Sequence, residues 1–136
     1  MQISKKVDDF LKQTQICVLA TTGPGQAPHA IPMWYLYRDG KIVITTSGTS
    51  QKSKNVARNG EAMVVFDKRE SPYFAVMIKG HAEIGPGLSR DEEYGVALRY
   101  LGEDGVAAFM QPYDAGESDD ATIVITPTKI IEYGDG

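Results

Sequence analysis

The sequence has few of the residues on which metal and thiol chemistry depends. Its 136 residues include one cysteine and two histidines. A lone Cys17 cannot form a disulfide within the chain, which is typical of a protein from a reducing cytoplasm. It lies among apolar neighbours, so we expect an inert buried thiol. With so few cysteines and histidines, placed far apart in the sequence, we expect no metal site.

Long apolar runs and an excess of positive charge are also missing. No apolar run approaches the ~18 residues needed to cross a bilayer. The first ten residues have no apolar segment behind their lysines, so we expect no signal peptide. Lys and Arg total 14 against 18 Asp and Glu, which argues against broad binding to nucleic acid. We therefore expect a cytoplasmic protein with no membrane and no nucleic-acid partner.

Motifs of nucleophilic catalysis are absent as well. There is no Gly-x-Ser-x-Gly elbow, and neither Gly-Pro-Gly triplet continues into a phosphate loop. We leave the catalytic residues unassigned, with Tyr35 and His29 as candidate proton donors.

The length allows one domain, and no repeat or linker divides residues 1–136. A chain this short buries only about two-thirds of its surface on folding. A large ligand would need a second subunit to complete its wall, which favours a homodimer.

The hydrophobic pattern predicts short helices between extended segments. Ile3, Val7, Phe10 and Leu11 share one helical face. Further helices are expected over residues 51–59, from a Ser89-x-x-Glu92 capping box to Gly102, and around 106–110. Residues 111–120 are expected to form a polar loop.

Extended runs make up most of the rest. They cover residues 16–20, 30–37, 41–46, 62–66, 73–84 and 122–133, the last interrupted at Pro127. Asp39-Gly40 predicts a tight hairpin, and tight turns make the strands mostly antiparallel. Six short strands favour a small closed barrel, so the predicted fold class is mainly β with short helices.

One polar constellation suggests an anion site. The strand ending at Thr45, Thr46 and Ser47 leads into a helix that opens with residues 50–55. The first turn of a helix leaves N–H groups unpaired and carries partial positive charge. Lys52 and Lys54 have the wrong sign for that dipole, which favours a bound anion. A solvated surface helix with two lysines is the alternative left open.

A neighbouring segment offers a surface for a flat ring. Pro32-Met33-Trp34-Tyr35 places large, apolar side chains near the expected anion site. A flavin-like ring needs such faces and backbone groups along its polar edge. Ordinary core packing is the alternative.

Taken in order, these motifs resemble the pyridoxamine 5′-phosphate oxidase-like family of flavin-binding proteins. The resemblance covers nearly the whole chain and is carried by residues 25–35, Asp39-Gly40, 44–46, Ser50-x-Lys52-x-x-Asn55-Val56-x-x-Asn59, 76–83 and 125–130. It implies a six-stranded antiparallel split β-barrel that dimerises and holds a flavin in each of two clefts between subunits.

The resemblance also assigns cofactor-binding residues. The segment Ala30, Ile31, Pro32, Met33, Trp34 and Tyr35 would lie along the flavin ring, and Thr45 and Thr46 would flank it. Ser50, Gln51 and Lys52 would hold the phosphate. With the neighbouring polar residues, the predicted set also includes Ser47, Lys54 and Asn55.

The sequence departs from the oxidase pattern at charged positions. That pattern has Arg, Lys, Arg and Gln where this chain has Ala30, Tyr35, Gln51 and Ala75. Each hydrogen bond to a charged group is worth about 1.5–3 kcal/mol, so binding of flavin mononucleotide (FMN) should be weaker than in the oxidase. Pyridoxamine phosphate is not the expected substrate. Lys52-x-x-Asn55 also resembles the branch that binds the F-420 type of deazaflavin coenzyme.

These features together predict a flavin-dependent oxidoreductase that uses FMN or the F-420 type deazaflavin and transfers hydride to an unknown small molecule. A non-catalytic flavin carrier is the alternative. A haem-binding or haem-degrading relative ranks lower, because it needs an axial ligand and His29 and His81 are the only imidazoles.

Overall fold

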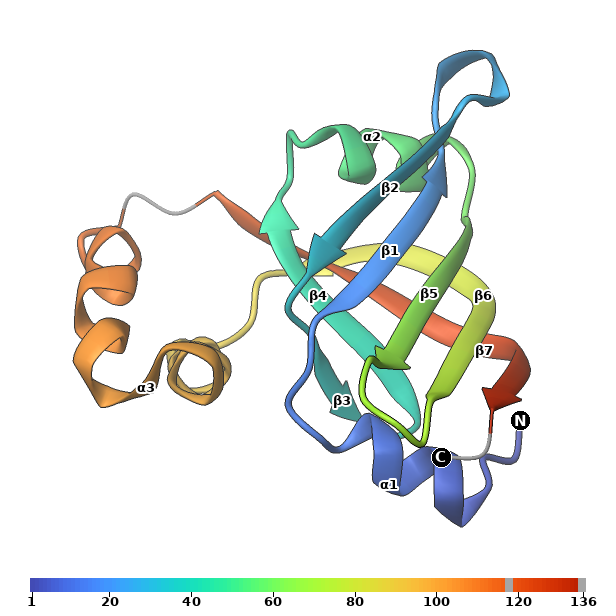
Figure 1. Ribbon diagram of the computed structural model, residues 1–136. Coiled ribbons are helices and arrows are strands. Elements are labelled where there is room, and N and C mark those ends of the chain that lie inside the picture. The colour runs from blue at the N-terminus through green and yellow to red at the C-terminus, as the bar shows by residue number, and fades with distance from the viewer. Residues whose placement is uncertain (117–118, 135–136) are drawn as a thin grey trace.

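Seven strands form one antiparallel sheet in the computed structural model, which describes residues 1–116 and 119–134 (Figure 1). The strand order is β2-β1-β5-β6-β7-β4-β3. The elements are α1 (Lys5–Leu11), β1 (Cys17–Thr22), the 3-10 helix η1 (Pro24–Gln26), β2 (Pro28–Met33), β3 (Leu36–Arg38), β4 (Lys41–Ser47), α2 (Gln51–Arg58), β5 (Glu61–Lys68), β6 (Phe74–Pro86), α3 (Arg90–Asp114) and β7 (Asp120–Gly134).

The mainly β fold class predicted from the sequence is confirmed, but the closed six-stranded barrel is corrected. The run expected over residues 30–37 is two strands, β2 and β3, separated at Trp34 and Tyr35. These two strands are the edges of the sheet and do not pair with each other in the described chain. Tyr35 leaves the ladder because its backbone N–H donates to the hydroxyl of Tyr100 on α3 (3.3 Å). The sheet therefore stays open along this side.

Alternating burial along the strands builds the core. In β5, for example, every second side chain from Ala62 to Phe66 is buried, as expected for a strand with one face inward. The core holds several fully buried side chains, including those of Leu19, Ile44, Val64, Phe66, Ile78 and Ile123. Figure 1 shows α1 and α2 at opposite ends of the curled sheet.

One local prediction is confirmed at a turn, and the interruption expected at Pro127 is corrected to a register shift. Asp39 and Gly40 both have positive φ (53° and 71°), which matches the tight turn between β3 and β4. Pro127 lies at a register shift between β6 and β7, where Gly80 pairs with it after Lys79 pairs with Lys129. A bulge tolerates the missing N–H of proline, so β7 continues through this position.

Helix α3 has two arms, and only the second extends further than the sequence indicated. It begins at the predicted cap, where the Ser89 hydroxyl accepts from the Glu92 N–H (3.2 Å). Gly102 (φ 71°, ψ 179°) has a non-helical backbone and ends the first arm of α3, as predicted, and a second arm follows over the residues in which a further helix was expected. Arg90 and Asp114 join the two far ends through hydrogen bonds of 2.9 and 3.2 Å. The loop expected over 111–120 is therefore helical up to Asp114.

Within that predicted loop, residues 117 and 118 lie outside the described residues. Figure 1 shows α3 standing to one side of the sheet. In the described part of the chain, no helix has both the length and the apolarity to span a membrane.

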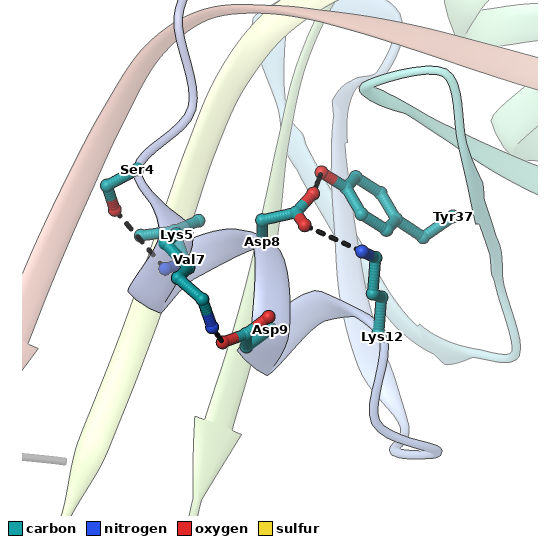
Figure 2. A network of polar contacts seen from close by, with 7 residues as sticks. All are labelled: Ser4, Lys5, Val7, Asp8, Asp9, Lys12 and Tyr37. Carbon is teal, nitrogen blue, oxygen red and sulfur yellow. Dashed lines mark hydrogen bonds and ion pairs between the residues drawn. The ribbon is translucent and has the colours of Figure 1, made fainter.

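A polar network attaches α1 to the sheet (Figure 2). The Ser4 hydroxyl caps the helix by accepting from the Val7 N–H (3.2 Å). Asp8 accepts from the ammonium of Lys12 (2.8 Å) and from the hydroxyl of Tyr37 on β3. These two contacts lower the pKa of Asp8 below its ordinary value of 3.8.

We expect Asp8→Asn to flatten the acid end of the stability profile. A carboxylate with a lowered pKa stabilises the fold above its unfolded-state pKa and loses that contribution as pH falls through the folded value. The wild type should therefore exceed the variant in free energy of unfolding at pH 7, and the difference should shrink as the pH falls below 3.8. Urea titrations across that range measure it. A constant difference would contradict the assignment.

Candidate functional site

A cavity of about 690 Å³ lies between α3 and the open side of the sheet. This volume falls within the range of about 300–1,000 Å³ that is usual for small-molecule sites. Its apolar lining comprises Ile16, Pro32, Met33, Trp34, Tyr35, Leu36, Val43, Val96, Phe109, Pro112 and Tyr113. Its polar lining comprises Thr45, Thr46, Ser47, Glu93, Asp119 and Asp120.

An aromatic cluster fixes one wall of this cavity. The Trp34 ring stacks on Tyr100 with centroids 4.7 Å apart and an interplanar angle of 1°. Phe109 lies 5.3 Å from Trp34 at a tilt of 40°. The Tyr100 hydroxyl accepts from the Tyr35 N–H and donates to the Gln15 carbonyl (2.7 Å). The wall is therefore held by residues from α3 and from the segment before β1.

The end of β4 connects the cavity to the beginning of α2. Thr46 lines the cavity, and its hydroxyl oxygen lies 3.2 Å from that of Ser50. Ser50 caps α2 by accepting from the Ser53 N–H (3.3 Å). The Ser53 hydroxyl in turn donates to the Ser47 carbonyl (2.8 Å). A chain of hydroxyl groups thus leads from the cavity to the helix terminus.

Lys52 lies in the first turn of α2 without a carboxylate partner among the described residues. Its side chain is half-buried, and this burial lowers its pKa. The backbone N–H groups of Gln51 and Lys52 have no acceptor within residues 1–116 and 119–134. An anion bound there would satisfy two donors and stabilise the charged ammonium.

Comparison with protein families matches residues 3–134 of the chain to pyridoxamine 5′-phosphate oxidase. The chain belongs to the pyridoxamine 5′-phosphate oxidase family. Comparison with the curated proteins gives no match. The family assignment therefore rests on the match along almost the whole chain.

Several solved structures share the fold of this protein. A conserved hypothetical protein of Mycobacterium tuberculosis superposes with a TM-score of 0.76 and 23% identity, covering 98% of this chain and 86% of that one. An F-420 reductase gives 0.76 and 20%, covering 95% and 98%. A FAD-binding protein of Mesorhizobium loti gives 0.65 and 19%, covering 96% and 92%. At these identities the likeness shows the fold, which is that of the split barrel.

The structure brings together about half of the site residues predicted from the sequence. Those that line the cavity are Pro32, Met33, Trp34, Tyr35, Thr45, Thr46 and Ser47. Those placed elsewhere are Ala30, Ile31, Ser50, Gln51, Lys52, Lys54 and Asn55. Ser50 and Lys52 still belong to the adjoining helix terminus, at which the phosphate was predicted.

Two predicted ligands have structural partners instead. Asn55 is fully buried and donates to the hydroxyl of Thr21 on β1 (3.0 Å). Its side-chain oxygen accepts from Gln51 (2.8 Å). Asn55 therefore holds α2 against the sheet and Gln51 supports Asn55 from the same helix, whereas Lys54 is exposed.

The two candidate proton donors do not meet at the cavity. The Tyr35 hydroxyl donates into the core, toward the carbonyls of Leu11 (2.9 Å) and Gln13 (2.8 Å). Burial raises its pKa to about 12. His29 lies on β2 and does not line the cavity, although its Nδ1 is buried without a partner among the described residues. His81, on β6, is exposed.

Glu93 is the residue that the sequence reasoning missed. It is only 5% exposed, it lines the cavity, and burial raises its pKa. The signal was its spacing, because Glu93 precedes Val96 and Ala97 by three and four residues and so shares their buried helix face. Glu93 was overlooked because it lies next to the capping residue Glu92, and acidic residues are common in the first turn of a helix.

Proposed function

We propose that the protein is a homodimeric oxidoreductase that binds FMN or an F-420 type deazaflavin. Membership of the pyridoxamine 5′-phosphate oxidase family supports a flavin-type cofactor. The observation that carries the proposal is the continuity between the aromatic cavity wall, Thr46 and the first turn of α2 with its unpartnered Lys52.

This geometry suggests which residues bind each part of the cofactor. Ser50, Lys52 and the backbone N–H groups of the first turn hold the phosphate. The segment from Pro32 to Trp34, with Thr45 and Thr46, lies beside the ring. A bound flavin supplies hydride transfer, and the protein supplies position and charge.

The proposed dimer is supported by the rim of the cavity. Ile16 and Phe109 both line it and are 46% and 42% exposed. Large apolar side chains at the mouth of a site favour a covering surface, which a second copy would provide. The lone, buried Cys17 supports a reducing compartment, and we infer the cytoplasm.

A flavin carrier without turnover is the second candidate. It is favoured by the Tyr35 hydroxyl, whose hydrogen bonds lie within the core rather than at the cavity. Incubating the flavin-loaded protein with nicotinamide donors separates the two functions. Repeated reduction and reoxidation supports the oxidoreductase, and a flavin that stays oxidised supports the carrier.

Trp34 provides a direct test of flavin binding because it is the only tryptophan in the sequence. FMN bound against it should quench most of the protein fluorescence, and riboflavin should do so only at higher concentration because it lacks the phosphate. Titrations with FMN, riboflavin and the F-420 coenzyme measure this. The visible spectrum of the purified protein provides an independent check. No quenching by any of the three would overturn the proposal.

A further inference from the structure

A second, smaller cavity of about 260 Å³ lies between α1 and the β5–β6 hairpin. Figure 1 shows α1 and the turn between β5 and β6 at the same end of the sheet, with α2 at the opposite end. The residues that line this cavity are Lys6, Asp9, Phe10, Gln13, Lys68 and Phe74. None of them lines the cavity between α3 and the sheet, so the two cavities are separate.

Two phenyl rings form the floor of the smaller cavity. Phe10 on α1 and Phe74 on β6 are 6% and 4% exposed, and their centroids lie 4.9 Å apart in an edge-to-face arrangement. Both belong to the main hydrophobic core, whose close packing holds the rings in place. A flat apolar ring placed on this floor would gain the edge and face contacts that aromatic pairs prefer.

Two lysines at this cavity carry charge that no carboxylate of the described chain neutralises. The Lys6 ammonium lies 4.5 Å from the centre of the Phe74 ring, and Lys68 is the cross-strand neighbour of Phe74. Neither lysine forms an ion pair among the described residues. The carboxylate of Asp9, which also lines the cavity, is paired with Lys5 at 2.6 Å. The cavity therefore has an excess of positive charge, although the net charge of the chain is −4.

An aromatic floor beneath two ammonium groups matches a flat ring that carries a negative charge. The side-chain amide of Gln13 makes no hydrogen bond within the described chain and adds a neutral donor for the same anion. A carboxylate accepts such hydrogen bonds from both kinds of donor. The volume lies below the range of about 300–1,000 Å³ that is usual for drug-sized ligands, which limits the apolar body to a single ring.

We propose that the cavity between α1 and the β5–β6 hairpin binds a monocyclic aromatic carboxylate. The ring lies on Phe10 and Phe74, and the carboxylate lies between the ammonium groups of Lys6 and Lys68. This binding needs no flavin and does not rest on the function proposed above.

Three flat molecules of matched shape test the charge preference. Benzoate, benzamide and benzamidine share the phenyl ring and carry a negative, a neutral and a positive group. Titration followed by backbone amide shifts in NMR spectra should show benzoate binding about tenfold more tightly than benzamide, with benzamidine weakest. Acetate has the charge without the ring and should bind more weakly than benzoate. The amides of Phe10, Gln13 and Phe74 should shift, whereas those of Thr45 and Thr46 in the larger cavity should not.

Lys6→Gln and Lys68→Gln separate charge from shape. Each variant removes one ammonium group and keeps both phenyl rings, so each should reduce the preference for benzoate over benzamide by about threefold. Both lysines are exposed, so both variants are expected to fold. The matched control is Lys79→Gln, an exposed lysine on β6 that does not line the cavity, and it should keep the wild-type preference.

The wild-type titrations alone can overturn the proposal. Equal affinity for benzoate and benzamide would do so, as would benzoate shifts confined to other parts of the chain or no shifts with benzoate. A preference that is unchanged in both lysine variants would also do so. The titrations are made without flavin, so they remain decisive if FMN fails to bind, and the two proposals fail independently.

Discussion

Replacing Lys52 with glutamate should weaken FMN binding by about a hundredfold and leave riboflavin binding nearly unchanged. Lys52 has no carboxylate partner in the described chain, and burial lowers its pKa. Such an ammonium gains more from a bound phosphate than a fully solvated one does. Reversing its charge also opposes the partial positive charge of the α2 terminus. Riboflavin lacks the phosphate and so does not report this contact.

The control for Lys52→Glu is Lys129→Glu. Lys129 is exposed on β7, so its replacement makes the same change in net charge outside the proposed phosphate site. Long-range repulsion of FMN would affect both variants equally. A common loss of affinity, or a loss in riboflavin binding as large as that in FMN binding, would place the phosphate elsewhere. Titration of FMN at two salt concentrations separates long-range electrostatic repulsion, which salt screens, from the local contact with Lys52.

Local sequence signals were sufficient for the strands and turns. The Asp39-Gly40 hairpin forms because both residues adopt positive φ, which depends on nothing outside the turn. The alternation in β5 requires only that one face of the strand point inward. The Ser89 cap is also local. These elements were predicted because their causes lie within a few residues of one another.

The break between β2 and β3 has a cause that is distant in the sequence. The Tyr35 N–H finds its acceptor in Tyr100, 65 positions along the chain. The second arm of α3 is secured by Arg90 and Asp114, which are 24 positions apart. A periodicity within one segment carries no information on such pairs. This is why the seventh strand and the extent of the second arm of α3 were missed.

Some site residues could likewise be predicted from local sequence and others could not. The sequence indicated Thr45, Thr46 and Lys52 because they follow one another from the end of a strand into the beginning of a helix. Glu93 was not, because its importance depends on the packing of α3 against β4 and on the burial that results. Asn55 is a different case. Its motif position suggested a ligand, and the structure shows in addition that its side chain bonds Thr21 and fixes α2 on the sheet.

Tyr35→Ala should lower the free energy of unfolding by about 3–5 kcal/mol, the range for a large aromatic side chain lost from a core. Tyr35 is 1% exposed and packs edge-on against Phe66 at 4.8 Å. Its hydroxyl donates toward the carbonyls of Leu11 and Gln13 and accepts from the side-chain amide of Gln15 (3.2 Å). The same side chain thus ties the end of α1 to the segment that carries Trp34.

Tyr35→Phe separates packing from hydrogen bonding in this interaction. It keeps the ring, so its expected cost is about 1–3 kcal/mol, that of leaving buried polar groups without a partner. Urea denaturation measures both variants against the wild type. FMN affinity of the folded Tyr35→Phe protein should be unchanged, because the hydroxyl donates into the core. Unaltered stability together with lost turnover would instead assign the hydroxyl to proton transfer.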